Sequence, residues 1–218
     1  MTTCFDRYGW VPDEHYRWDL YQRAIDSIRS TDWNSKRGCL VIHDDCSKRN
    51  FPEPKLDIPV YFTRKAEKKG IQLNNTECIT EACQYADWVL VFDSDAIVKP
   101  YWVEEAFKWI DRFQDHGLVA GFNIFGSKWH PVVEEKEDYY IKHSDGGCGF
   151  LFRAGDFIPQ KDHDAWEIAI HLMGRPRGRH YIVPKKPLMN HLGHYGYDHK
   201  AEMGIIAEPS ANDTHKDF

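Results

Sequence analysis

Apolar residues recur at helical spacing in three segments of the first half of the chain. Tyr21, Ala24, Ile25 and Ile28 follow the i, i+3, i+4, i+7 pattern, which predicts an amphipathic helix. Two further segments have apolar positions at Cys78, Ile79, Ala82, Cys83 and Ala86, and at Val103, Ala106, Phe107 and Ile110. Three helices are therefore expected before about residue 115.

Short apolar runs separate these helical segments. They predict strands at residues 2–6, 39–43, 59–62 and 87–92. Strands that alternate with helices of about ten to fifteen residues are typical of right-handed crossovers between parallel neighbours. We expect an α/β fold in which a mainly parallel central sheet carries helices on both faces.

The second half of the chain has a different pattern. Strands are expected at residues 118–124 and 149–153, and a helix at 165–173. The remaining residues are rich in Gly, His and aromatic side chains, which is typical of loops that form a substrate side. No repeat or Gly/Ser linker divides the chain, so we expect one domain over residues 1–218.

Composition narrows the class of protein. The 218 residues are 42% hydrophobic, enough for one sizeable core. Lys and Arg number 28 against 34 Asp and Glu, a net charge of -6, which disfavours nucleic acid as a partner. The sequence shows neither a membrane span nor a signal peptide, and its six cysteines form no Cys-x-x-Cys pair. We expect a cytoplasmic protein without a zinc ribbon.

Five carboxylates follow the ends of predicted strands. They are Asp6, Asp44, Asp45, Asp93 and Asp95. Ligands of open α/β sheets bind outside the carboxyl ends of the strands, so these side chains should share one edge. Five neighbouring carboxylates repel one another unless a cation or hydrogen-bond donors meet them.

The run Asp93-Ser94-Asp95 is the first candidate for chemistry at this edge. Two carboxylates at i and i+2 after a buried strand can point into one crevice as the strand gives way to a turn. Hard oxygen ligands with spare coordination positions suit Mg²⁺ or Mn²⁺ shared with a diphosphate. The alternative is that these residues only cap the helix that follows.

The second candidate is the polar end of the strand at residues 39–43. Asp44, Asp45 and Ser47 could accept hydrogen bonds from a base N–H or a ribose hydroxyl. The alternative is a turn closed by an Asx-type hydrogen bond, without a ligand.

These segments together resemble the GT-A glycosyltransferases, especially the family 2-like group. The resemblance is carried by residues 3–7, 24–28, 44–47, 69–71, Asn74-Asn75, and 89–95 with Pro100. Looser matches lie at residues 146–153, 162–167 and 190–194. Compact virus-encoded glycosyltransferase domains of large algal viruses are similar in size and layout. The resemblance implies a nucleotide-sugar-binding half at about residues 1–115 and an acceptor and catalytic half at about 116–218.

The resemblance also implies roles for individual residues. Asp44 or Asp45 would hold the nucleobase or ribose, and Asp93 would reach the ribose. Asp95, with Asp93, would bind Mn²⁺ or Mg²⁺ bridging the donor diphosphate, and His191 would be a further ligand. Further donor contacts would come from Asp6, Arg64, Asn75 and Ser94, and acceptor contacts from Gly146, Gly147 and Trp166.

An inverting sugar transfer needs a carboxylate that removes the proton from the acceptor hydroxyl. Asp164 is the first candidate, because it precedes the helix expected at residues 165–173. It could instead only cap that helix. Asp162, Asp145 and Asp156 are rivals, and the Glu-Asp pair usual at this place is Asp162-His163-Asp164 here.

The expected function is transfer of a hexosyl or deoxyhexosyl group from a UDP-sugar to a hydroxyl acceptor on a glycan or glycoprotein. Two other functions compete with it. Phosphatases of the haloacid dehalogenase type also carry Asp-x-Asp after an apolar strand, but that motif normally opens the domain, whereas 92 residues precede Asp93 here. A nucleotide-sugar-binding module without catalysis is the second alternative.

Overall fold

The computed structural model describes residues 2–3, 14–34, 36–47, 51–113, 118–120, 132–143, 149–159 and 181–191. The helices of this part are α1 (Glu14–Arg29), α2 (Ile71–Ala82), α3 (Trp102–Arg112) and the short 3-10 helix η1 (Ala154–Asp156). The strands before residue 100 are β1 (Thr2–Thr3), β2 (Leu40–Asp44), β3 (Val60–Arg64), β4 (Trp88–Val91) and β5 (Ala96–Val98). The later strands are β6 (Leu118–Ala120), β7 (Val132–Glu135), β8 (Tyr139–Lys142), β9 (Phe150–Arg153), β10 (Tyr181–Pro184) and β11 (Met189–His191).

The first three strands form a parallel sheet in the order β1-β2-β3. Thr2 pairs with His43, and Leu40 pairs with Val60. The carboxyl ends of β2 and β3 therefore lie at the same edge, as the alternation of strands and helices predicted.

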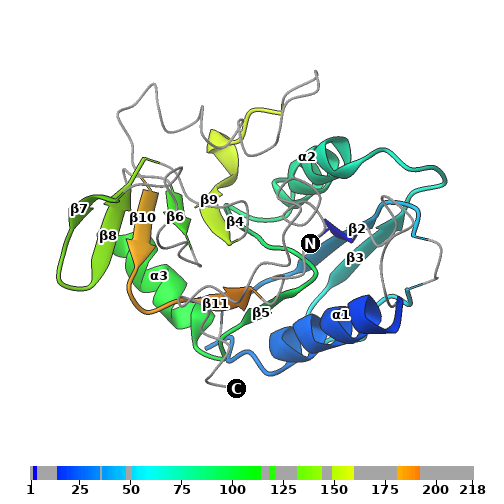
Figure 1. Cartoon of the computed structure of the whole chain (residues 1–218), viewed down its shortest axis with the longest axis horizontal. Coiled ribbons are helices and arrows are strands. Elements are labelled where there is room, and N and C mark those ends of the chain that lie inside the picture. The colour runs from blue at the N-terminus through cyan, green and yellow to red at the C-terminus, as the bar shows by residue number, and fades with distance from the viewer. Residues whose placement is uncertain are drawn as a thin grey trace, which may run out of the picture.

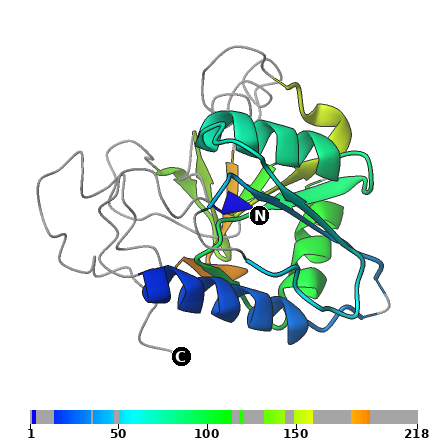
Figure 2. The ribbon, with the colours of Figure 1, turned by 90° about the vertical axis from the view of Figure 1, so that its right-hand side faces the viewer.

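Helices cover both faces of these strands, with α2 on one face and α1 on the other (Figures 1 and 2). On the α1 face, Tyr21, Ile25 and Ile28 pack in one core cluster with Leu40 and Ile42 of β2. On the other face, Ile79 of α2 packs with residues of β4, β9 and β10. Alternate residues of a strand point to opposite faces, so β2 contributes to both layers.

The second half of the described structure is a six-stranded sheet in the order β4-β9-β6-β10-β8-β7. Only β6 and β10 pair in parallel within it, and the other ladders are antiparallel. The expected α/β architecture is present, but the mainly parallel pairing holds only for β1–β3. Residues 136–138 alone link β7 to β8, which is too short for a parallel crossover and forces an antiparallel hairpin.

A two-stranded antiparallel ladder joins the two halves. β5 pairs with β11, with His191 opposite Ala96 and Met189 opposite Val98. Neither strand was expected from the sequence, because each has only three residues and depends on a partner far along the chain. The ladder brings the segment after β10 beside the segment after β4.

The predicted elements match closely at most positions, with one difference at a helix end and with some predicted residues outside the described part. α2 ends at Ala82 rather than continuing toward Ala86, since Gln84 and Tyr85 instead form turn hydrogen bonds to Glu81 and Ala82. β6 ends at Ala120, and residues 121–124 of the expected strand lie outside the described part. The expected helix at 165–173 lies there as well. No described helix is long and apolar enough to cross a membrane.

Candidate functional site

An acidic turn connects β4 to β5. The turn is closed by the Ala96 N–H, which donates to the Asp93 carbonyl at 3.1 Å. Ser94 and Asp95 are buried and Asp93 is half-buried. The buried strand predicted at residues 87–92 therefore does deliver two carboxylates to its carboxyl end, as the i, i+2 spacing indicated.

The backbone of His191 lies directly beside this turn. Its pairing with Ala96 in the β5–β11 ladder places it next to the residue that follows Asp95. These two candidate metal ligands are almost one hundred residues apart in the chain, so only the ladder brings their backbones together. Carboxylate oxygens and an imidazole suit Mn²⁺ or Mg²⁺ with room for phosphate oxygens, so the donor set fits the ion that the resemblance implies. The side chain of His191 lies outside the described part, and no three described His, Cys, Asp or Glu side chains gather closely enough to hold a metal ion.

Asp44, at the end of β2, is completely buried and makes its contacts within the chain. One carboxylate oxygen accepts hydrogen bonds from the backbone N–H of Ser47, at 3.2 Å, and from the Ser47 hydroxyl. Arg64, at the end of β3, brings its guanidinium Nη1 to 3.0 Å from the other oxygen and also donates to the Ser47 carbonyl. Asp44 thus closes the turn after β2 and forms an ion pair with Arg64 of the neighbouring parallel strand β3.

The buried hydroxyl of Tyr21 faces the same region from α1. Burial, and secondarily the negative charge of Asp44, raises the pKa of Tyr21 to about 12. The hydroxyl has no hydrogen-bond partner within the described structure. It therefore stays protonated over the physiological range.

Asp45 is also buried, and its carboxylate binds the segment that leads into α2. One oxygen accepts the Lys69 N–H at 2.6 Å, and the other accepts the Gly70 N–H at 2.8 Å. Gly70 has a φ of 85°, a left-handed conformation that glycine adopts without strain, and it is the N-cap residue of α2. Asp45 therefore supplies the acceptor and the negative charge that a helix start favours.

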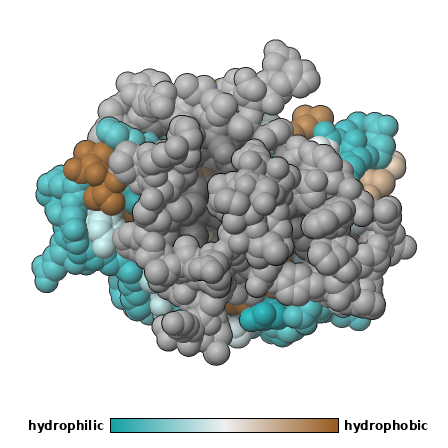
Figure 3. Space-filling view, viewed as in Figure 1, coloured by the Kyte–Doolittle hydropathy of each residue, from teal (hydrophilic) through white to brown (hydrophobic). Residues whose placement is uncertain are grey.

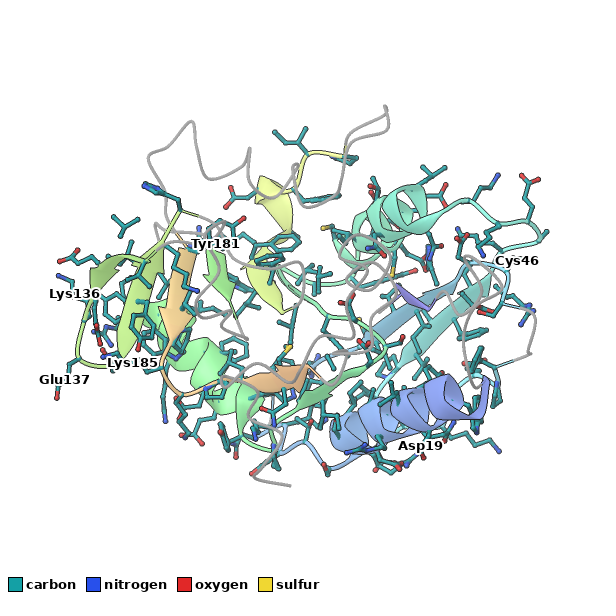
Figure 4. All side chains as sticks on the ribbon, in the orientation of Figure 1. Asp19, Cys46, Lys136, Glu137, Tyr181 and Lys185 are labelled. Carbon is teal, nitrogen blue, oxygen red and sulfur yellow. The ribbon has the colours of Figure 1, made fainter. Side chains whose placement is uncertain are left out.

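Both carboxylates of the β2 end thus have oxygens engaged by the chain itself. The turn interpretation of the sequence is present in the structure for Asp44, whose bond to the Ser47 N–H is of the kind that closes such turns. The role of either carboxylate toward a nucleobase or ribose stays a prediction. Figure 4 places Cys46, which follows them, far from the β7–β8 hairpin marked by Lys136.

Two asparagines on the first turns of α2 face the interior. The Asn74 side-chain amide donates to the His43 carbonyl at 3.2 Å. Asn75, a candidate donor contact, is buried, and its Oδ1 has no hydrogen-bond partner in the part of the chain described. A buried oxygen without a hydrogen-bond partner destabilises the folded protein, and a ligand or water that donates a hydrogen bond to it would remove this penalty.

Two residues of this region, His43 and Glu81, were not among the candidates predicted from the sequence. His43 Nε2 lies 2.6 Å from Oε2 of Glu81 in the last turn of α2. A polar signal was present, since His43 directly follows the apolar run Leu40-Val41-Ile42. Its partner could not be identified from sequence, because 38 positions separate the two residues.

Several site candidates lie outside the described residues. They are Asp6, Gly146, Gly147, Asp164 and Trp166, together with the rival bases Asp145 and Asp162. The rival Asp156 is described, and it ends η1 directly after β9. Arg153 pairs with Trp88 at the start of β4, whereas the acidic turn follows the end of β4. Asp156 thus follows the strand end remote from Asp93, which disfavours it as the base.

A cavity of about 160 Å³ lies inside the molecule between β2, β4 and the three α-helices. Its lining is mainly apolar, includes Trp33, Trp102 and Leu151, and contains no carboxylate among the described residues. Its lining also includes Lys36, Arg37 and the buried Asn75, but its described residues offer no carboxylate for a metal ion, so the acidic turn, rather than this cavity, is the candidate metal site.

The solved structures that are similar to this chain include several of TarS from S. aureus. TarS 1-349 matches with a TM-score of 0.56 at 12% identity, covering 79% of this chain and 56% of that one. TarS 1-349 in complex with UDP-GlcNAc matches with a TM-score of 0.57 at 14% identity, covering 79% and 54%. The complex with UDP matches with a TM-score of 0.56 at 14% identity, covering 79% and 56%. The chain thus spans just over half the length of these TarS chains.

These likenesses confirm the GT-A type of α/β fold expected from the sequence. No curated protein matches the sequence. The model of glycosyl transferase family 2 matches residues 15–160, which is more than half of the chain. The match includes β2, the acidic turn and β9, the segments on which the resemblance depended. The chain therefore belongs to glycosyl transferase family 2.

Proposed function

We propose that the chain is a metal-dependent glycosyltransferase that moves a sugar from a UDP-sugar to a hydroxyl of a glycan or glycoprotein, with inversion. Membership of glycosyl transferase family 2 carries the proposal. The acidic turn at the carboxyl end of β4 supports it, because family resemblance implies a metal and diphosphate site there. The choice of UDP follows from the similar fold of TarS, whose structure holds UDP-GlcNAc.

Asp93 and Asp95 would hold Mn²⁺ or Mg²⁺, with His191 as a further ligand. When bound, the ion would act as a Lewis acid that stabilises the charge growing on the departing diphosphate. Ser94, Arg64 and Asn75 would contact the donor from the surrounding elements. The Asn75 Oδ1 in particular could accept a hydrogen bond from the nucleotide sugar, since it has no partner in the described structure.

The acceptor hydroxyl must lose a proton as it attacks the anomeric carbon. Asp164 would take that proton, and Gly146, Gly147 and Trp166 would line the acceptor side. A hexosyl or deoxyhexosyl group is the sugar class proposed. Inversion follows from a single displacement, in which the acceptor attacks from the face opposite the leaving diphosphate.

The proposal is tested by measuring donor binding with calorimetry, using UDP-, GDP-, CMP- and dTDP-sugars with and without Mn²⁺. We expect a UDP-sugar to bind only with the metal present, and Asp95→Ala to abolish this binding. Asp111→Ala is the matched control, because Asp111 is an exposed carboxylate on α3. Normal Mn²⁺-dependent binding by Asp95→Ala would overturn the metal assignment.

The competing functions give different results in companion assays. A phosphatase would release phosphate from a generic phosphomonoester in a metal-dependent reaction. A binding module would hold the UDP-sugar without hydrolysing or transferring it. The proposed enzyme releases UDP in the presence of an acceptor, and the anomeric configuration of the product, read by NMR, decides between inversion and retention.

A further inference from the structure

His43 is a buried polar residue on the strand that leads to the candidate donor site. Only 3% of the residue is exposed, on the face of β2 that α2 covers. Its Nε2 lies 2.6 Å from Glu81 Oε2, whereas its Nδ1 has no hydrogen-bond partner in the described structure. The role of this imidazole is not part of the site described above.

The surroundings select one protonation state of the imidazole. Burial lowers the pKa of His43, the hydrogen bond that the ring donates to Glu81 opposes this, and Lys65 lowers the pKa further. A protonated ring would carry an N–H at Nδ1 with no acceptor, inside the protein. The ring is therefore neutral near pH 7 and donates its Nε2–H to Glu81.

His43 and Asp45, at the end of β2, attach α2 at both of its ends. The His43 side chain contacts Glu81 in the last turn, and the His43 carbonyl accepts from Asn74 near the first turn. Asp45 accepts the N–H groups of Lys69 and Gly70 at the N-cap. The helix is therefore fixed along its length to the strand end that precedes the site.

We propose that His43 is a positioning residue for the nucleotide-sugar donor, acting through α2. The inference rests on the proposed function. Loss of the His43–Glu81 hydrogen bond loosens the last turn of α2, while the Glu77–Lys65 ion pair and the packing of Ile79 still hold the helix in place. A small shift of the helix then displaces the buried Asn75, together with the segment that runs back to Arg64. Donor affinity falls, while the chemistry of the bound donor stays the same.

The charged and titratable groups around His43 set the direction of a pH effect. Glu81 contacts it from α2, Lys65 faces it from the end of β3, and the amino-terminal group adds a further positive charge. Lys65 is paired with Glu77 at 2.6 Å, and Glu81 also interacts with Tyr85. At acid pH the ring is protonated at Nδ1, which has no hydrogen-bond acceptor in the described structure. The protonated ring destabilises this arrangement, so the affinity for the nucleotide-sugar donor should weaken as pH falls below neutrality.

The experiment measures UDP-GlcNAc binding by calorimetry with Mn²⁺ at pH 7.5 and pH 5.5. We expect His43→Leu to weaken binding about tenfold at pH 7.5, raising the donor KM with kcat unchanged. His43→Gln keeps an N–H that can donate to Glu81, so it should bind within about threefold of the parent and lose the extra weakening at pH 5.5. Thr80→Ala is the control, because it removes a side-chain hydrogen bond within the same helix, to the Thr76 carbonyl, and leaves the charges around His43 unchanged.

Each outcome separates the inference from the proposed function. Absence of UDP-GlcNAc binding by the parent chain, with binding of no other nucleotide sugar, refutes the proposed function. Normal donor affinity in His43→Leu, with only a lower unfolding temperature, shows a merely structural histidine and overturns the inference. If His43→Leu does not fold, Glu81→Leu tests the same hydrogen bond from its half-exposed side, and unchanged affinity there is equally decisive.

Discussion

The two neighbouring carboxylates at the end of β2 are stabilised by different chemistry. Asp44 meets the guanidinium of Arg64 and the hydroxyl of Ser47. Asp45 meets two backbone N–H groups, with one donor for each oxygen. A buried carboxylate needs such partners because its desolvation is otherwise prohibitive. Asp45 therefore depends on its charge and on both of its acceptor positions.

Replacement of Asp45 by Asn should destabilise the protein by about 1–3 kcal/mol, the cost of leaving a buried partner unpaired. The amide can accept from one N–H, but its NH₂ group would face the other. Urea denaturation measures the difference. Asp57→Asn, at an exposed carboxylate, is the control and should change stability by less than about 0.5 kcal/mol. Equal effects of the two variants would contradict a stabilising role for the two hydrogen bonds that Asp45 accepts.

His43 makes the folding stability depend on pH, and the sign follows from its lowered pKa. The unfolded chain binds the proton more readily, with an ordinary pKa of about 6.5. The contribution to stability is therefore complete above that pH and is lost as pH falls toward the pKa of the folded state.

Urea denaturation at pH 7.5 and pH 5.5 should show a loss of stability for the parent chain that is smaller in His43→Gln. Other groups titrate over the same range, so the comparison between the two proteins carries the result. An identical pH dependence in both would mean that His43 has the same pKa folded and unfolded.

At the scale of elements, hydrogen bonds from α1 and the residues just after it hold the segments that follow the acidic turn. The Ser27 hydroxyl accepts the N–H of Val98 in β5 at 3.1 Å and donates to the Ala24 carbonyl at 2.7 Å. One turn later, the Thr31 hydroxyl accepts the indole N–H of Trp102 at 3.0 Å, at the start of α3. The side chains of Ser27 in α1 and of Thr31 just after α1 thus hold both the strand after the acidic turn and the helix that follows it.

Ser27→Ala should destabilise the protein by about 1–3 kcal/mol, because the buried N–H of Val98 loses its acceptor. Thermal unfolding followed by circular dichroism measures the effect. Ser30→Ala is the matched control, since Ser30 is an exposed serine at the end of the same helix. If the two substitutions lower the unfolding temperature equally, the Ser27–Val98 bond does not anchor β5.

At the scale of the whole molecule, the site is assembled from both halves of the chain. Asp44 and Asp45 follow β2 of the three-stranded sheet, whereas Asp93 and Asp95 follow β4 of the six-stranded sheet, so the expected single edge is divided between two sheets. The chain returns after β10, and β11 pairs with β5 directly after the acidic turn. The described apolar patches on the surface in Figure 3 are small and separate. Such scattered apolar residues are ordinary for a protein surface.

The acceptor half should supply the base, and Asp164→Asn tests this. We expect unchanged UDP-sugar binding and a kcat lowered about 10²- to 10⁴-fold, the usual contribution of general base catalysis. Calorimetry and an assay of UDP release measure the two quantities. Asp156→Asn is the comparison and should keep full activity. The reverse result would make Asp156 the base and refute Asp164.

Periodicity in the sequence determined the α1, α2 and α3 positions, β2–β4 and the placement of Asp93 and Asp95 after a strand. These features depend on residues within a few turns of one another, so local pattern is sufficient. The antiparallel six-stranded sheet, the His191–Ala96 pairing and the His43–Glu81 contact were decided only in the tertiary structure. They join residues far apart in the chain, and the free energy that selects them comes from packing that no single segment contains.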